Sequence, residues 1–362
     1  MSDVGIYVHV PFCLTRCGYC DFNAYAGLDH LAPRYVRSLL TEAGLAAPAW
    51  SEDQVVSIFF GGGTPTTLDV ADLKGVLMHV RDRFAVRDDA EVSIEANPDT
   101  VDIAKLEGSL AAGFDRLSMG AQSFDRGVLE ALERLHSPDS VRRAFVAARA
   151  AGYENVNLDL IYGADGEGLD SWERTLEQAI DLAPEHISAY ALTIEPATAL
   201  GRKVQTGAVP APDPDLQADM FSAACDLLRD AGYHHYEVSN WAKPGHECRH
   251  NRLYWSQGDY RGFGCAAHSH SAGRRWWNVR TPERYIALVG RGEPTEAAGE
   301  HLDAETRRIE GLQLALRTRD GVPTDALEPE DLTGLIEPAP GERVRLTRAG
   351  RLLANEVSLR LR

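Results

Sequence analysis

The chain has 362 residues, of which 44% are hydrophobic and 25% are charged. This composition is typical of a globular protein with enough apolar residues for a sizeable core. The formal net charge is −17, so the chain lacks the basic surface that sequence-independent binding to nucleic acid requires. We therefore expect no nucleic-acid partner.

The start of the chain runs from Met1 into a strand-like segment, without the basic and apolar regions of a signal peptide. No apolar run reaches the roughly 18–20 residues that cross a bilayer. Six cysteines are sparse for a disulfide framework, and Cys13, Cys17 and Cys20 lie close together. These features predict a cytoplasmic protein in which the clustered cysteines bind metal.

Six short apolar runs are predicted to be strands, with helical patterns between them. They cover residues 5–10, 55–60, 91–96, 116–120, 156–161 and 186–192. One helical pattern has an apolar stripe from Leu216 to Leu228 and ends near Gly232. Strands that alternate with crossover helices form a parallel sheet. We therefore predict an α/β fold of the partial TIM-type, a (β/α)6 barrel with nearly all-apolar strands; the alternative is an open doubly wound sheet.

Polar or glycine-rich groups follow each predicted strand. The cysteine loop follows the first strand, and Gly-Gly-Gly-Thr-Pro at 61–65 follows the second. The third and fourth strands end near Glu95 and Gln122. The fifth holds Asn157 and Asp159 and ends at 162–163, and the sixth reaches Glu195. In βα barrels the active site is built at the C-terminal ends of the strands. We therefore expect these groups to share one pocket.

The regular alternation stops near residue 236. Residues 236–277 are rich in Gly, His, Trp and Tyr, which predicts irregular structure with short strands. A helix over 304–316, a hairpin around 343–347 and a final helix over 348–361 predict a small α/β module of winged-helix type. We therefore divide the chain into a core barrel (1–235), a connecting segment (236–300) and a C-terminal domain (301–362).

The cysteines form a Cys-x3-Cys-x2-Cys array at Cys13, Cys17 and Cys20. Structural zinc sites close with four ligands, and ordinary iron–sulfur clusters use four thiolates. Three thiolates leave one metal corner open for another ligand. No second cysteine pair completes a zinc site, so an iron–sulfur cluster is favoured. The alternatives are a zinc knuckle completed by His9 or Cys248, and buried thiols that bind no metal.

This array resembles the cluster motif of the radical S-adenosylmethionine (SAM) superfamily. The resemblance implies a [4Fe–4S] cluster on the three cysteines, with S-adenosylmethionine bound at the open iron and available for reductive cleavage. It also implies that the cofactor contacts Tyr7, Tyr19, Gly62, Gly63, Thr64, Glu95, Gln122, Arg134 and Asp159. The structural alternatives are a buried, hydrogen-bonded acid for Asp159 and a solvated helix residue for Arg134.

Segments 5–13, 61–65, 117–124 and 157–163 are similar to the oxygen-independent coproporphyrinogen III oxidase group, as is the C-terminal module. The true oxidases have an additional cysteine where this chain has Phe22, and a long extension before the cluster motif. Only twelve residues precede Cys13 here. Both differences favour the other branch of the group, the haem chaperone HemW family.

Residues 246–255 resemble the His-Asn-x-x-Tyr haem-binding motif of that family, which makes His250 and Tyr254 the haem candidates. A neutral imidazole is a common axial ligand of haem iron. On spacing alone, His250 would be a loop histidine with satisfied hydrogen bonds. The rival ligands are His246, Cys248, His268 and His270.

Two functions follow from the resemblance. The first is a haem chaperone that carries a [4Fe–4S] cluster and S-adenosylmethionine, binds haem as cargo and delivers it to acceptor haemoproteins such as membrane respiratory enzymes. Such a protein would be cytoplasmic or peripheral at the membrane, and the resemblance leaves homodimer formation and cofactor cleavage open. The second is an oxygen-independent coproporphyrinogen III oxidase that decarboxylates propionates. A plain zinc protein is the non-enzymatic alternative.

Overall fold

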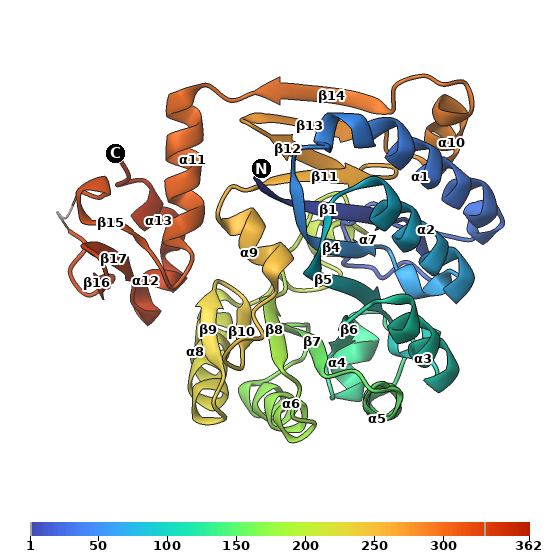
Figure 1. Cartoon of the computed structure of the whole chain (residues 1–362). Helices are drawn as coiled ribbons and strands as arrows, with labels where there is room; N and C mark the ends of the chain where they lie inside the picture. Colours follow the sequence, from blue (N-terminus) through green and yellow to red (C-terminus); the bar gives the residue numbers. More distant parts are fainter. Residues whose placement is uncertain (1, 329–330) are drawn as a thin grey trace.

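The structure is a computed structural model of the chain and describes residues 2–328 and 331–362 (Figure 1). Its main sheet has the strand order β14-β13-β12-β11-β1-β4-β5-β6-β7-β8-β10-β9. Six central strands pair in parallel in chain order. They are β1 (Asp3–Val10), β4 (Gln54–Gly62), β5 (Val86–Ala96), β6 (Arg116–Gln122), β7 (Asn155–Tyr162) and β8 (His186–Ala191). The predicted α/β fold and its six strands are confirmed.

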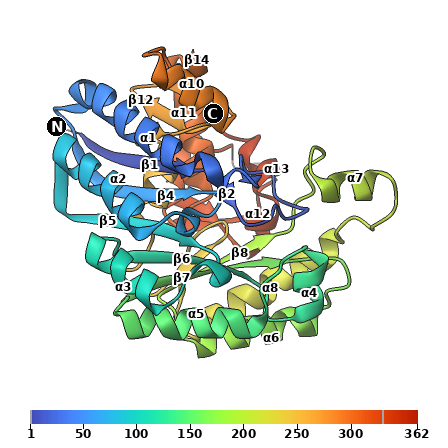
Figure 2. The same cartoon turned by 90° about the vertical axis from the view of Figure 1, so that its right-hand side faces the viewer.

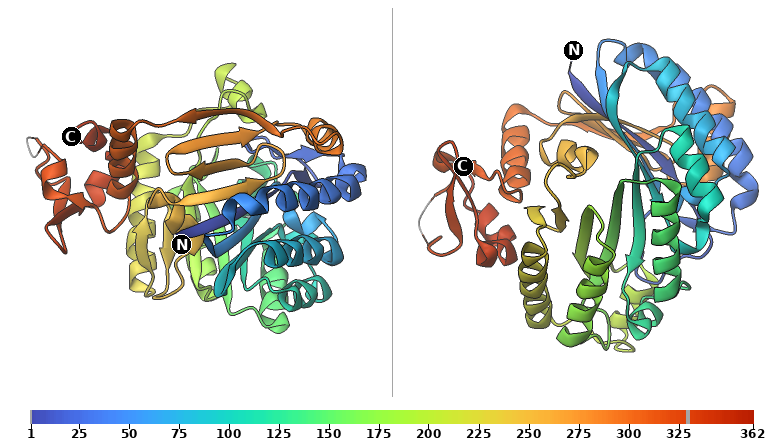
Figure 3. Two further views of the ribbon diagram at one scale, coloured as in Figure 1. Left: turned by 45° about the horizontal axis from the view of Figure 1, so that its top comes forward. Right: turned by 60° about the horizontal axis from the view of Figure 1, so that its bottom comes forward.

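Helices cover the convex side of this sheet, which curves as an arc (Figure 3). Among the described residues no strand pairing joins β14 to β9, so the arc is open. The outer helices are α1 (Ala32–Ala46), α2 (Val70–Arg83), α3 (Ile103–Ala112), α5 (Pro138–Ala151), α6 (Leu169–Asp181) and α8 (Pro214–Asp230). Within the part of the chain described, no helix is long and apolar enough to span a membrane.

The central strands alternate between two chemically different faces. Apolar residues such as Ile6, Ile58 and Leu117 point outward and pack against the helices in one buried core. The intervening residues face the concave side and are largely polar: Tyr7, His9, Ser57, Glu91, Ser93, Glu95, Ser118, Asn157, Asp159, His186 and Ser188. The prediction of nearly all-apolar strands was wrong, because the residues on the concave side are largely polar.

The segment after residue 236 extends the main sheet at both ends. The hairpin β9 (His234–Glu237) and β10 (Asn240–Ala242) pairs with β8, and β11 (Asp259–Phe263) pairs in parallel with β1. Three antiparallel strands follow: β12 (His268–Ser271), β13 (Arg274–Asn278) and β14 (Glu296–His301). Short strands are therefore present as predicted. The prediction of irregular structure was wrong in two respects: these strands extend the regular main sheet, and residues 249–255 form the helix α9 (Arg249–Trp255).

Short elements surround the C-terminal ends of the central strands. β2 (Phe12–Cys13) and β3 (Tyr25–Ala26) pair within the cysteine loop. Two small helices, α4 (Arg126–Ala131) and α7 (Ala199–Gln205), follow β6 and β8, and Figure 2 shows α7 standing apart from the sheet. The helix α10 (Pro282–Gly290) packs against α1 on the convex side.

The C-terminal residues form their own small sheet and apolar cluster. The long helix α11 (Ala304–Leu316) matches the predicted range and leads into the sheet order β15-β17-β16. These strands are β15 (Val322–Pro323), β16 (Ile336–Ala339) and β17 (Arg343–Leu346). The predicted single final helix was wrong: it is divided at Leu353 into α12 (Arg348–Leu352) and α13 (Ala354–Ser358). The three domain ranges stay predictions, and Met1, Pro329 and Glu330 within them lie outside the described residues.

Glu42 on α1 connects the outer helix layer to the sheet extension. Its carboxylate forms a buried ion pair with Arg261 on β11 at 3.0 Å. It also accepts hydrogen bonds from the backbone N–H of Gly264 (2.9 Å) and from the side chains of Asn278 (2.8 Å), Tyr285 (2.7 Å) and Thr295 (3.0 Å). A buried charge satisfied by so many donors is costly to remove, because the donors then lose their partner.

Replacing Glu42 by alanine should therefore destabilise the fold strongly. We expect Glu42→Ala to lower the free energy of unfolding by about 3–5 kcal/mol, because Arg261 would remain buried without its counter-charge. Denaturant unfolding followed by circular dichroism measures this change. As a control, Glu107→Ala on the exposed side of α3 should change stability by less than about 0.5 kcal/mol. A similar loss in both variants would contradict the role assigned to Glu42.

Candidate functional site

The cysteine loop is attached to the glycine-rich loop by backbone hydrogen bonds. Gly63 N–H donates to the carbonyl of Val10 at 2.8 Å, and Thr64 N–H donates to the carbonyl of Phe12 at 2.8 Å. A Cβ atom on Gly63 would lie 2.7 Å from the Phe12 carbonyl oxygen, and Gly62 has φ +111°. Both positions therefore require glycine, which explains the glycine run at this turn.

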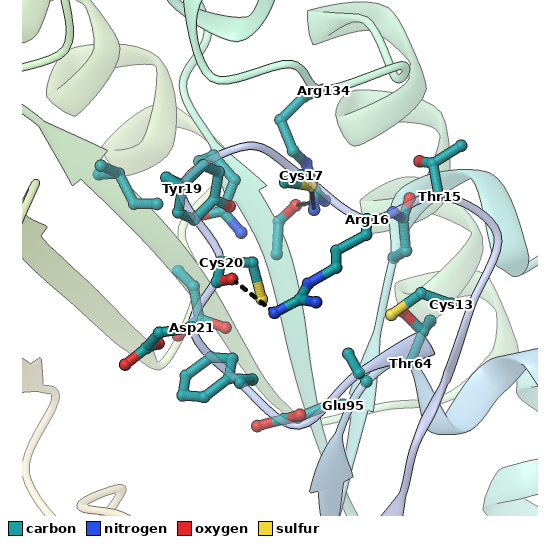
Figure 4. Close-up of a pocket in the computed structure, with 18 of the residues that line it drawn as sticks. Cys13, Thr15, Arg16, Cys17, Tyr19, Cys20, Asp21, Thr64, Glu95 and Arg134 are labelled. Atoms are coloured by element: carbon teal, nitrogen blue, oxygen red, sulfur yellow. Dashed lines mark hydrogen bonds between the residues drawn. The ribbon is translucent and has the colours of Figure 1, made fainter. Parts of the chain in front are cut away.

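The three thiols line a cavity of about 370 Å³ at the C-terminal ends of the central strands (Figure 4). Cys13 Sγ lies 3.5 Å from Thr64 Oγ1, and Arg134 Nη1 donates to Cys17 Sγ at 3.5 Å. In Figure 4 the side chain of Arg16 lies between Cys13 and Cys20. All three cysteines are free. The structure therefore brings together the predicted cysteines, with guanidinium groups beside them.

The donor chemistry of this cavity fits an iron–sulfur cluster. Thiolates are soft ligands, and here they surround a space large enough for more than one atom. Within the described ranges, no three His, Cys, Asp or Glu side chains converge as they would around a single metal ion. Burial raises the pKa of Cys13, and it raises the pKa of Cys20 to about 11. Metal binding must therefore displace protons from these thiols.

Most of the predicted S-adenosylmethionine contacts line the same cavity. They are Tyr19, Gly62, Gly63, Thr64, Glu95, Gln122, Arg134 and Asp159. Tyr7 does not line it; its hydroxyl is hydrogen-bonded to His9 Nδ1 at 3.0 Å and it lies in a second cavity. The alternative of a solvated helix residue is wrong for Arg134, which follows α4 in a loop and donates to the carbonyl of Gly120 at 3.0 Å.

Two half-buried acids, Glu95 and Asp159, give the cavity an unusual carboxyl pair. Burial, and then the nearby Asp159, raise the pKa of Glu95 to about 8. Burial also raises the pKa of Asp159, which accepts hydrogen bonds from Ser118 Oγ (3.0 Å) and Asn157 Nδ2 (2.9 Å). Glu95 Oε2 accepts from Gly62 N–H at 3.0 Å. The acids are thus held in place beside the cysteines, where hydroxyl or amino groups of a ligand would meet hydrogen-bonding oxygens.

A second cavity, of about 730 Å³, adjoins the first and shares Asp21, Phe22, Gly62 and Glu95 with it. Its other walls come from β1, α9 and the sheet extension, and they are rich in aromatic rings: Tyr7, Tyr254, Tyr260, His268 and Trp277. Sequence reasoning did not single out Tyr260, Trp277 or Arg280 here, although the aromatic and histidine content of 236–277 was a signal. It also missed Arg16 and Ser118 in the first cavity.

The two haem candidates from the sequence differ in their access to this cavity. His250 is 2% exposed and lines neither cavity. Its Nδ1 is hydrogen-bonded to Ser57 Oγ (2.9 Å) and its Nε2 to the Tyr254 hydroxyl (2.8 Å). Tyr254 lines the second cavity but uses its hydroxyl for this contact. Both ring nitrogens of His250 are therefore occupied.

The rival ligands are also placed by the structure. Cys248 is 4% exposed and donates to Glu91 at 3.5 Å. His270 is buried, with Nδ1 3.1 Å from Asp259. His246 is half-buried and lies outside the second cavity. His268 is exposed and is the rival whose side chain lines that cavity.

The six-stranded parallel arc and the three-cysteine cavity define a radical SAM protein. The Radical SAM superfamily model matches residues 7–179. The solved coproporphyrinogen III oxidase (HemN) of Escherichia coli, described as a radical SAM enzyme, has the same fold with a TM-score of 0.86 and 25% identity. That likeness covers 98% of this chain and 89% of the oxidase.

Sequence relatives show to which family within the radical SAM superfamily the chain belongs. The haem chaperone HemW of Mycobacterium tuberculosis is 42% identical over 98% of this chain and 93% of its own length. The haem chaperone HemW of Bacillus subtilis is 35% identical over 97% of both chains. The chain therefore belongs to the HemW family, within the radical SAM superfamily.

The surroundings of His250 generate a pH prediction. Burial lowers the pKa of His250 to about 3, from about 6.5 for an exposed histidine. Between these values the unfolded chain binds a proton that the folded chain does not. This contribution to stability is present above about pH 6.5 and is lost as the pH falls toward 3, with a slope of up to about 1.4 kcal/mol per pH unit.

Denaturant unfolding between pH 4 and pH 6 checks the prediction. We expect His250→Gln to reduce the dependence of stability on pH by about one proton. Equal slopes for wild type and His250→Gln would contradict the buried, neutral state of this imidazole.

Proposed function

We propose that this protein is a haem chaperone that binds haem as cargo and delivers it to acceptor haemoproteins, such as respiratory enzymes. It acts in the cytoplasm and at the membrane surface, and it carries a [4Fe–4S] cluster and S-adenosylmethionine. The observation that carries this proposal is the aromatic-lined cavity of about 730 Å³ beside the cysteine cavity. The names of the near-full-length relatives support it.

The cofactor assignment rests on the cysteine cavity. Cys13, Cys17 and Cys20 would hold the cluster, which supplies an electron and an open iron when bound. Gly62, Gly63 and Thr64 would cradle the aminoacyl end of S-adenosylmethionine. Hydroxyl groups of this ligand would be bound by the carboxyl oxygens of Glu95 and Asp159, and Tyr19, Gln122 and Arg134 would complete the contacts.

The second cavity suits a flat, mostly apolar cargo. Small-molecule sites are typically concave, about 300–1,000 Å³ in volume, and lined by aromatic side chains with a few polar groups. This cavity has that character, and it is open to the surface, where cargo can enter and leave. A chaperone must release what it binds, so an accessible site suits delivery better than a sealed one.

Coproporphyrinogen III oxidation is the second candidate, because the fold agrees closely with that of the E. coli oxidase. Phe22 argues against it. This side chain stands where the resemblance places the additional cysteine of the oxidases, and it is 66% exposed between the two cavities. An aromatic ring at this position can cover a porphyrin face. Unlike a cysteine thiol, it can neither bind a metal nor donate a hydrogen atom.

One anaerobic experiment distinguishes the two functions. Protein reconstituted with iron and sulfide is titrated with haem, and the same sample is assayed with coproporphyrinogen III, S-adenosylmethionine and reductant. We expect saturable haem binding at one haem per chain and no protoporphyrinogen formation. Elemental analysis of the same sample should find iron in place of zinc.

The outcomes are separate for each function. Absence of haem binding by protein with an intact cluster would overturn the chaperone proposal. Steady conversion of coproporphyrinogen III would establish the oxidase instead. Zinc bound by the three cysteines, with no iron–sulfur absorbance after reconstitution, would overturn the cluster assignment for both.

A further inference from the structure

Two histidines line the second cavity, and they differ in whether a ring nitrogen is available. His9 is 5% exposed, with Nδ1 bonded to the Tyr7 hydroxyl (3.0 Å) and Nε2 bonded to the carbonyl of Asn23 (2.9 Å). His268 is exposed, and within the described part of the chain its imidazole takes part in no hydrogen bond or ion pair. An iron ligand needs a free nitrogen lone pair, which His268 retains.

The sheet extension fixes the position of this imidazole. His268 begins β12 and lies opposite Trp277 on β13 in the antiparallel pairing. The two rings are stacked, with centroids 5.5 Å apart and an interplanar angle of 25°. One face of the imidazole is therefore covered by the indole, and the residue lines the cavity. Ligands that are held on strands by packing keep their orientation better than ligands on loops.

The remaining walls offer flat contact surfaces and one cation. Tyr260 packs edge-on against Tyr254, with ring centroids 4.6 Å apart, and both line the cavity. Phe22 is on the wall shared with the cysteine cavity. Arg280 is exposed at the rim, and in the described ranges its guanidinium forms no ion pair. A guanidinium binds carboxylates well, so it can take a propionate of the cargo.

We propose that haem binds in this second cavity with His268 as the axial ligand of its iron, Trp277, Tyr260 and Phe22 beside the porphyrin, and Arg280 at a propionate. The inference rests on the proposed function, since it assigns the haem site of the same chaperone. It differs from the motif-based assignment to His250. That residue serves the fold, because Ser57 and Tyr254 occupy its nitrogens.

The location next to the cysteines has a mechanistic consequence. Asp21 and Phe22 directly follow Cys20, and both line the two cavities. Assembly of a cluster on Cys20 will therefore fix the position of the wall against which haem packs. The state of the cluster can thus be communicated to the cargo through two adjacent residues, without a long-range conformational change.

Haem titration of cluster-loaded protein tests the assignment. We expect His268→Ala to weaken haem binding about tenfold or more and to abolish the Soret spectrum of the wild type. Added imidazole should restore that spectrum, since it supplies the missing ligand. His268→Tyr should bind haem with a different, tyrosinate-type spectrum. The matched control His246→Ala, which removes a histidine outside the cavity, should behave like the wild type.

The failures of the two proposals are distinguishable. If wild type and His268→Ala bind haem with the same affinity and spectrum, the ligand assignment is overturned while the chaperone function stands. If His250→Gln, and not His268→Ala, loses the wild-type spectrum at unchanged thermal stability, the motif histidine is the ligand. If the wild type binds no haem, the proposed function itself fails. Circular dichroism melting of each variant separates loss of the ligand from loss of the fold.

Discussion

The site depends on one backbone contact, the pairing of the loop after β1 with the loop after β4. The hydrogen bonds from Gly63 to Val10 and from Thr64 to Phe12 place the cysteine loop across the end of the neighbouring strand. This approach is close enough to exclude any side chain at Gly63. Cys13 then lies beside Thr64, and the thiols face the ends of β5, β6 and β7. The cysteine cavity exists because these two loops are joined.

A second constraint is that the parallel arc stays open. β1 pairs with β4 on one side and with β11 on the other, so the sheet continues into the antiparallel strands β12–β14. Their inner side supplies His268 and Trp277 to the second cavity. The short helix α9 packs on the concave side of the arc. There the carboxylate of Glu91 accepts hydrogen bonds from the backbone N–H groups of Arg249 and His250. The concave side of the arc thus holds the cysteine cavity, the aromatic-lined second cavity and a set of buried, hydrogen-bonded polar groups.

Much of this arrangement could be predicted from residues that are close in sequence. The strands and the helix 304–316 follow from local apolar patterns, and the groups at the strand ends converge because parallel strands end at one edge. The pairing of β11 with β1 joins residues more than 200 positions apart, and no local pattern contains it. For the same reason the second cavity could not be predicted, because its walls come from β1, the cysteine loop and β11–β13, which are far apart in the sequence. The hydrogen bond between His250 and Ser57 also joins residues that are distant in sequence, so the burial of His250 could not be predicted locally.

The central claim is that cargo haem and the cluster occupy adjoining cavities with a shared wall. Zinc protoporphyrin IX, a fluorescent analogue of haem, tests this claim directly, because a nearby iron–sulfur cluster quenches its emission. Its fluorescence lifetime should be shorter on cluster-loaded protein than on the cluster-free Cys13→Ser variant. Cys225→Ser, which changes a cysteine outside both cavities, should keep the short lifetime. Equal lifetimes with and without the cluster, at full occupancy by the porphyrin, would contradict the claim.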